Sequence, residues 1–110
     1  SMERYFNFVI SKDVFEHIEP SVLSSIISQL SNVCKTLFVI IPLGDGSKYI
    51  VPEYEKDITH IIREDKEWWS SMFLKNGFTI KEFSHRVPGI KDNWAHYPEG
   101  NGFFILESVL

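Results

Sequence analysis

Residues 6–18 read FNFVISKDVFEHI, and the fold prediction starts from this stretch. Its first part, Phe6 to Ser11, is an aromatic and β-branched run of strand length. Strands with such near-continuous apolar sequence are typically covered on both faces, as in parallel sheets. We therefore expect a central parallel strand here, with polar side chains following directly at its carboxyl end.

A helix and a second strand are expected next. Pro20 suits the first turn of a helix, where its missing N–H costs nothing. The residues that recur at helical spacing after it are Val22, Leu23, Ile26, Ile27, Leu30, Val33 and Cys34. Thr36 to Ile41 is then a second apolar run, which Pro42 closes. A strand, a helix and a strand in this order predict a right-handed crossover between two parallel strands.

The remaining chain predicts a loop, a helix and two strands. No period is sustained from Pro42 to Glu64, and we expect this long connection to be functional. Asp65 can cap a helix from Lys66 to Asn76, with Gly77 as its left-handed stop. Phe78 to Val87 and Gly102 to Val109 are expected to be strands that pair antiparallel, because no helix separates them.

Composition limits the class of protein. The chain has 110 residues, 44% of them hydrophobic, which predicts one small globular domain, residues 2–110. Its formal charge of −4 and the lack of a basic patch argue against nucleic acid as a partner. No apolar run is long enough to cross a membrane, so we expect a soluble protein. The single cysteine, Cys34, is expected to be a buried apolar residue, which fits a reducing cytoplasm.

The predicted order of elements resembles the second half of the class I (Rossmann-like) S-adenosylmethionine-dependent methyltransferase fold. Residues 7–18, NFVISKDVFEHI, resemble the family's hydrophobic strand followed by a Leu-Glu-His-Ile type segment. Pro42 after the next strand and Asn76-Gly77-Phe78 before another resemble its later landmarks. Asn7 departs from the family, since most relatives have Asp there.

The resemblance implies a partial α/β fold. Two parallel strands, Phe6 to Ser11 and Thr36 to Ile41, would lie side by side, with an antiparallel C-terminal strand pair beyond the second and helices packed on the sheet. Gly102 to Val109 would pair with the second strand, and Phe78 to Val87 would lie outside it. No Gly-x-Gly-x-x-Gly loop follows a strand, so the half that binds most of the cofactor is absent. The chain alone is therefore expected to bind S-adenosylmethionine weakly or not at all, and to be inactive.

Three residues at the end of the first strand are candidates for cofactor contact. Ligands of open α/β sheets bind beyond the carboxyl ends of parallel strands, and Ser11, Lys12 and Asp13 occupy that edge. Alternatively, Asp13 only caps a short helical turn and Lys12 is solvated.

The candidate catalytic residues are Glu16, His17 and His60. In relatives the Glu-His pair lies at the floor of the active site, where a histidine can orient a substrate or accept its proton. His17 could instead be a structural residue that bonds a backbone carbonyl. Asp57, Thr59 and Trp94 are the candidate substrate-binding residues. No metal is expected, because residues 17, 57 and 60 match no established metal-ligand spacing.

Two functions follow from the resemblance. The first is a methyltransferase, represented by its substrate-side half, that acts on a small-molecule acceptor. The second is a non-catalytic α/β binding or assembly module derived from such an enzyme. In both cases the edge formed by Phe6 to Ser11 lacks the neighbouring strand of the complete fold, so we expect a homo-oligomer that uses this edge.

Overall fold

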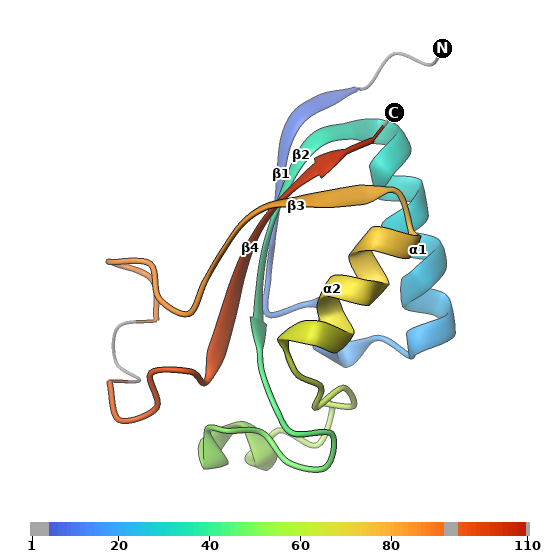
Figure 1. The fold of residues 1–110 in the computed structure, drawn as a ribbon. Helices are drawn as coiled ribbons and strands as arrows, with labels where there is room; N and C mark the ends of the chain where they lie inside the picture. The colour runs from blue at the N-terminus through green and yellow to red at the C-terminus, as the bar shows by residue number, and fades with distance from the viewer. Residues whose placement is uncertain (1–4, 92–94, 110) are drawn as a thin grey trace.

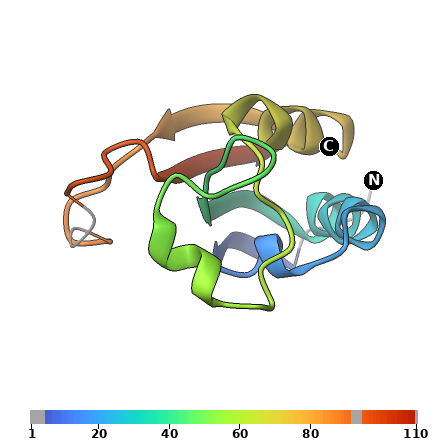
Figure 2. The same ribbon diagram turned by 90° about the horizontal axis from the view of Figure 1, so that it is seen from below.

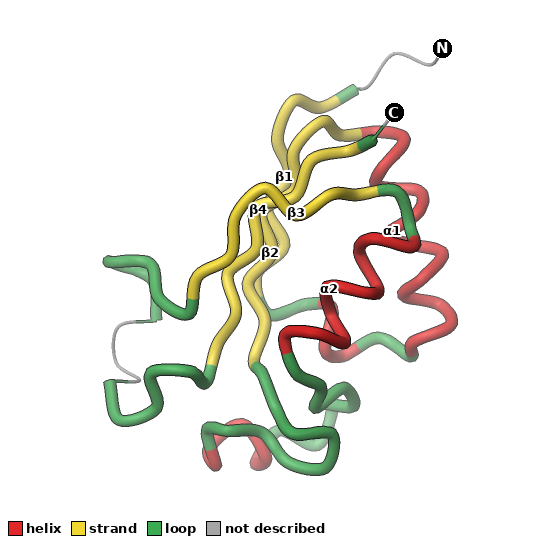
Figure 3. Tube along the Cα trace, viewed as in Figure 1, coloured by secondary structure: helices red, strands yellow, loops and turns green. Residues whose placement is uncertain are grey.

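The structure is a computed structural model, and it describes residues 5–91 and 95–109. The described chain forms four strands, two α-helices and two short 3₁₀ helices. Figures 1 and 3 show their arrangement. In chain order these are β1 (Phe6–Lys12), η1 (Phe15–His17), α1 (Pro20–Val33), β2 (Cys34–Pro42), η2 (Pro52–Lys56), α2 (Lys66–Lys75), β3 (Phe78–Ser84) and β4 (Asn101–Ser108).

The sheet has the order β1-β2-β4-β3. β1 and β2 are parallel, and the other two pairs are antiparallel. Ile10 pairs with Phe38, which in turn pairs with Ile105. This arrangement confirms the predicted fold class, the predicted strand order and both predicted directions of pairing.

Both helices lie against the same face of the sheet (Figure 1). The core between the two layers is formed by one side of the strands, including Leu37 and Phe104, and by the apolar sides of the helices. Leu23 of α1 and Trp69 of α2 are fully buried there. Because alternate residues of a strand point to opposite faces, Val9 of β1 packs on this core while its neighbours point away.

The opposite face of β1 is bare, which corrects the expectation of a strand covered on both faces. Phe6, Phe8 and Ile10 are 56%, 51% and 62% exposed. They share one face because they are two residues apart. No helix of the described residues packs on that side, and β1 is an edge strand in the described sheet.

Two predicted boundaries are wrong by a few residues. Cys34 is buried as expected, but it begins β2 instead of ending the helix. β3 ends at Ser84 instead of Val87, because the chain leaves β4 after Ser84 and Val87 bridges to Ile90.

Both ends of the second helix follow the prediction closely. The Asp65 side chain accepts a hydrogen bond from Trp68 N at 2.9 Å, and Asn76 caps the C-terminus of α2. Gly77 follows with φ of 99°, and a Cβ atom there would lie 2.5 Å from Ser31 Oγ of α1. Glycine is therefore required at this position both for the left-handed backbone and for the close approach of the two helices.

The long connection between β2 and α2 is built from short hydrogen-bonded turns. It contains η2 and a bridge between Gly44 and Tyr49, and its course lies beyond the end of the sheet in Figure 2. Two backbone bonds attach it to η1, since Ile61 N and Ile62 N donate to the carbonyl oxygen of Glu16 at 3.0 and 3.1 Å. Within the described part of the chain, neither α-helix is long and apolar enough to cross a membrane.

Candidate functional site

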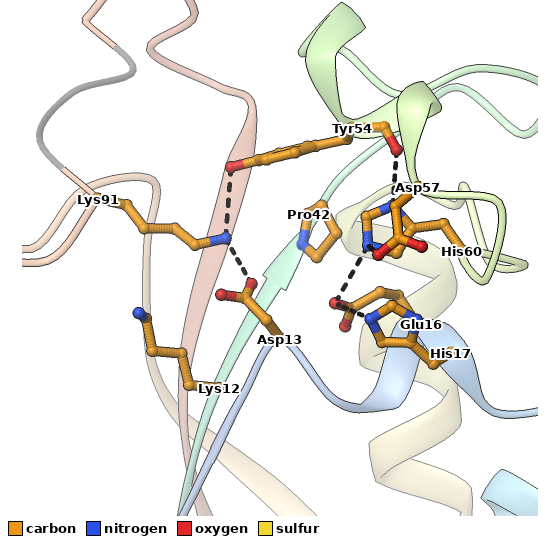
Figure 4. A pocket seen from close by; sticks show the side chains of 9 residues that line it. All are labelled: Lys12, Asp13, Glu16, His17, Pro42, Tyr54, Asp57, His60 and Lys91. Atoms are coloured by element: carbon orange, nitrogen blue, oxygen red, sulfur yellow. Dashed lines mark hydrogen bonds and ion pairs between the residues drawn. The ribbon is translucent and has the colours of Figure 1, made fainter.

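A cavity of about 440 Å³ opens at the carboxyl ends of β1 and β2 (Figure 4). Side chains from both strands, both 3₁₀ helices and three connections meet there. They are Lys12, Asp13, Glu16, His17, Pro42, Tyr54, Asp57, His60 and Lys91. Parallel strands direct their carboxyl ends to one edge, which is why residues that follow β1 and β2 converge.

Glu16 forms the buried floor of this site. Its side chain is fully buried, and neither carboxylate oxygen has a hydrogen-bond partner among the described residues. Burial raises the pKa of Glu16 to about 7, and the negative charge of Asp13 acts in the same direction. The site therefore contains a carboxyl group that can change its charge near neutral pH.

Two imidazole rings face the Glu16 carboxylate. His17 Nε2 lies 3.4 Å and His60 Nε2 lies 3.8 Å from Glu16 Oε2, and the two ring centroids are 4.5 Å apart. The other ring nitrogens contact backbone carbonyls: His17 Nδ1 is 3.1 Å from Thr59 O, and His60 Nδ1 is 2.7 Å from Tyr54 O. A carbonyl oxygen can only accept, so Nδ1 carries the proton and Nε2 of each neutral ring presents a lone pair to Glu16.

Asp57 completes the polar wall of the cavity. Its Oδ1 accepts from Thr59 N at 2.9 Å and from the Thr59 hydroxyl, and these bonds lower the pKa of Asp57. Its Oδ2 lies 3.6 Å from His60 Nε2. Thr59 thus orients both the Asp57 carboxylate and, through its carbonyl, the His17 ring.

A lysine that the sequence does not single out closes the other side. Lys91 forms an ion pair with Asp13, and its Nζ lies 3.1 Å from Asn101 Oδ1 and 3.3 Å from Tyr54 OH. No local pattern marks Lys91 or Tyr54 as site residues, because both reach the cavity through the paths of irregular connections. The only sequence signal for this site was the presence of polar residues directly after the predicted strands.

The predicted site residues fall into three groups. The structure brings Lys12, Asp13, Glu16, His17, Asp57 and His60 into one cavity. Ser11 is buried behind it with its hydroxyl unpartnered among the described residues, and Thr59 supports the wall without lining it. Trp94 lies outside the described residues.

The alternative roles considered for these residues are resolved in part. Asp13 does not cap η1, whose N-cap residue is Val14, and its carboxylate pairs with Lys91 instead. Lys12 is exposed, although it also lines the cavity. His17 does bond a backbone carbonyl, but its other nitrogen faces the cavity.

No protein-family model and no curated protein sequence matches the chain. Solved structures do match it in fold. Mitomycin 7-O-methyltransferase MmcR superposes with a TM-score of 0.68 at 11% identity, over 94% of this chain and 30% of that chain. LepI, solved in complex with SAM, gives 0.65 at 8% identity, over 96% and 27%.

A third structure is covered more completely. The provisionally assigned methyltransferase BH2331 of Bacillus halodurans C-125 gives a TM-score of 0.60 at 15% identity, over 92% of this chain and 68% of that chain. The chain thus spans less than a third of the first two proteins. At these identities the likeness concerns the fold, and the chain has the partial α/β fold of a class I S-adenosylmethionine-dependent methyltransferase.

Proposed function

We propose that the chain is the substrate-side part of an S-adenosylmethionine-dependent methyltransferase that acts on a small-molecule acceptor. The observation that carries this proposal is the position of the cavity: it lies at the carboxyl ends of the parallel strands, in a fold shared with a known methyltransferase. Ligands of open α/β sheets bind at that edge.

The residues present fit one wall of a cofactor site. S-adenosylmethionine would supply an activated methyl group on a sulfonium centre. Asp57 contributes negative charge that attracts a cation to the cavity, whereas Asp13 and the Tyr54 ring already face the ammonium group of Lys91. Ser11, Lys12 and Asp13 are proposed to contact the cofactor. The absence of a Gly-rich loop limits this chain to a minor share of the binding surface.

The histidines are proposed to act on the acceptor. A hydroxyl acceptor uses an oxygen lone pair to form the new bond to the methyl carbon, the sulfur keeps the electrons of the bond that breaks, and the hydroxyl proton goes to a base. His17 Nε2 or His60 Nε2 can take this proton, because both present a lone pair at the cavity. Glu16 would stabilise the imidazolium that forms.

The proposal is tested by assaying methyl transfer with the protein encoded by the longest reading frame that contains this chain. We expect transfer of radiolabelled methyl from S-adenosylmethionine to a small molecule, and a turnover about 100-fold lower for His17→Gln or His60→Gln. His85→Gln is the matched control, because His85 lies outside the cavity and contacts Asn101 O. Failure of that reading frame to bind S-adenosylmethionine would contradict the proposal.

A non-catalytic binding or assembly module is the second candidate. The bare face of β1 favours it, since exposed apolar edge strands pair readily with other chains. One matched structure is a complex between a methyltransferase activator and its partner from Haloferax volcanii. We propose that this chain self-associates through β1. Isothermal titration of the longest reading frame that contains the chain with S-adenosylmethionine separates the two functions, since a pure assembly module gives no heat.

The proposed location is the cytoplasm. Cys34 is the single cysteine of the chain and it is buried, so this chain makes no internal disulfide.

A further inference from the structure

We propose that Glu16, His17 and His60 form a binding site for a divalent transition-metal cation, with zinc as the best fit. Each residue offers one ligand atom, and these atoms all lie within 4.8 Å of one another. No metal was expected from the sequence, because residues 17, 57 and 60 match no established metal-ligand spacing.

The distances between ligand atoms suit a tetrahedral ion. Zinc binds histidine nitrogen and carboxylate oxygen at about 2.0–2.1 Å, which places two ligands of a tetrahedron about 3.4 Å apart. The Glu16 oxygen lies 3.4 Å from His17 Nε2 and 3.8 Å from His60 Nε2. The third separation, between the two histidine nitrogens, is within 4.8 Å, so the rings would approach each other by up to about 1.4 Å when they bind an ion.

Both rings are held in the orientation that metal binding needs. The Nδ1 atoms donate to the carbonyl oxygens of Thr59 and Tyr54, so the Nε2 lone pairs point inward. Histidine ligands of metals usually donate their other N–H to such an acceptor, which fixes the ring. Tyr54 and Thr59 thus act as positioning residues for His60 and His17.

The charge of the cluster calls for a cation. Two Nε2 lone pairs and an unpartnered carboxylate converge, and among the described residues no donor satisfies either Glu16 oxygen. A buried polar group without a partner is costly. A metal ion placed among the three groups would satisfy all of them at once. Two imidazole ligands favour zinc and its neighbours over magnesium or calcium.

The site also has room for a further ligand. Asp57 Oδ2 lies 3.6 Å from His60 Nε2, and the cluster borders the cavity of about 440 Å³. Three protein ligands and an open fourth position are typical of catalytic zinc sites. A cation here would lower the pKa of a coordinated acceptor hydroxyl, and the proton would then go to solvent instead of to His17 or His60.

Titration of the chelator-treated chain with zinc chloride tests the site. We expect one ion per chain by calorimetry, and Co²⁺ in its place should give the visible absorption of a four-coordinate ion. His60→Gln and Glu16→Gln should each weaken zinc binding at least 100-fold. His85→Gln and His96→Gln, which alter histidines outside the cluster, should leave it unchanged.

A further variant distinguishes a ligand from a structural histidine. Cysteine also binds zinc, so His60→Cys should retain tight binding and add a sulfur-to-cobalt charge-transfer band. Circular dichroism confirms that each variant is folded. Equal zinc affinity in folded His60→Gln and in the unaltered chain would overturn the proposal, and so would the absence of zinc binding to the folded chain. The assay needs no methyl transfer, so its failure would leave the proposed function standing.

Discussion

Glu16 combines two roles in one residue. Its carbonyl oxygen accepts the hydrogen bonds that attach residues 61 and 62, while its carboxylate is buried between two histidines. The backbone bonds place His60 beside the carboxylate, although 44 positions separate the two residues in the sequence. The geometry of the cluster therefore depends on a backbone contact that any residue at position 16 could make, and its chemistry depends on the side chain.

Ionisation of Glu16 should make the metal-free chain less stable at high pH. The pKa of this carboxyl is about 7 in the folded chain and 4.5 in an unperturbed one, so the folded state holds a proton that the unfolded state releases. The stabilisation is complete below pH 4.5 and is lost as the pH rises through 7. In chelator, we expect the Glu16 carboxyl to cost the folded state about 2 kcal/mol between pH 5.5 and 8.

Urea unfolding at both pH values measures this effect. Glu16→Gln is the reference, because it keeps the shape of the side chain and cannot ionise. The unaltered chain should lose stability relative to this variant as the pH rises. A difference between the two proteins that does not change with pH would show that Glu16 is ionised in the folded chain over this whole range, as it is in the unfolded chain.

Loss of the Lys91 ion pair should destabilise the chain by about 1–3 kcal/mol, since its Nζ is nearly buried and also bonds Asn101. Lys91→Met removes the charge and keeps the apolar stem. Lys81→Met is the matched control, because the pair that Lys81 forms with Glu107 is exposed to solvent and should contribute much less to stability. Equal losses in urea unfolding would mean that the Lys91 network adds nothing beyond a surface pair.

The strands and helices whose apolar residues recur with a clear period could be predicted from the sequence. The paths of the irregular connections could not. The apolar runs indicated β1 and β2, and the stripe after Pro20 indicated α1, because burial on one or two faces leaves a regular pattern. Glu16, His17 and His60 were site candidates through the resemblance to the methyltransferase fold, and the structure brings them into one cavity. Lys91 was missed because its ion pair depends on the path of the connection between β3 and β4, which no period describes.

The boundary errors have a similar cause. Cys34 fits the helical stripe in sequence, yet it pairs with Phe6 in the sheet, so a tertiary contact decides its state. Val87 bridges to Ile90 instead of continuing β3, and apolar patterning contains no signal for this local contact.

The junction of α2 and β3 gives a prediction about helix packing. Gly77→Ala should cost about 2–3 kcal/mol, because it forces a left-handed backbone and a contact with the buried Ser31. Gly89→Ala has the same backbone conflict, with φ of 87°, but nothing lies within 4 Å of its added methyl group. It should cost about 1 kcal/mol.

Thermal or urea unfolding of the two glycine variants isolates the helix contact. Their difference measures the close approach of α1 and α2, since the backbone penalty is common to both. Similar losses in the two variants would show that Ser31 moves aside without cost.

At the scale of the whole molecule, the sheet is covered on one side only (Figure 1). Phe6, Phe8 and Ile10 are exposed on the other side. Ile10 pairs with Phe38 of β2, which pairs with Ile105 of β4, so the apolar face extends onto the neighbouring strands. An apolar face that borders an unpaired edge is a favourable surface for a second chain.

Self-association through this face should appear in sedimentation equilibrium. We expect the mass to rise with concentration above the 12.8 kDa of one chain. Phe8→Glu should restore the monomer, because it places a charge in the apolar face. Leu74→Glu is the control, since Leu74 is also 56% exposed but lies on α2. A constant mass near 12.8 kDa would contradict self-association.

The position of Cys34 makes this residue a natural reporter of local opening. Its thiol is completely buried, it pairs with Phe6 at the start of the parallel strands, and the chain has no other cysteine. A thiol reagent can reach it only after the corner between α1 and β2 has opened. The labelling rate at high reagent concentration is therefore the opening rate of that corner, measured at one known atom without any engineered probe.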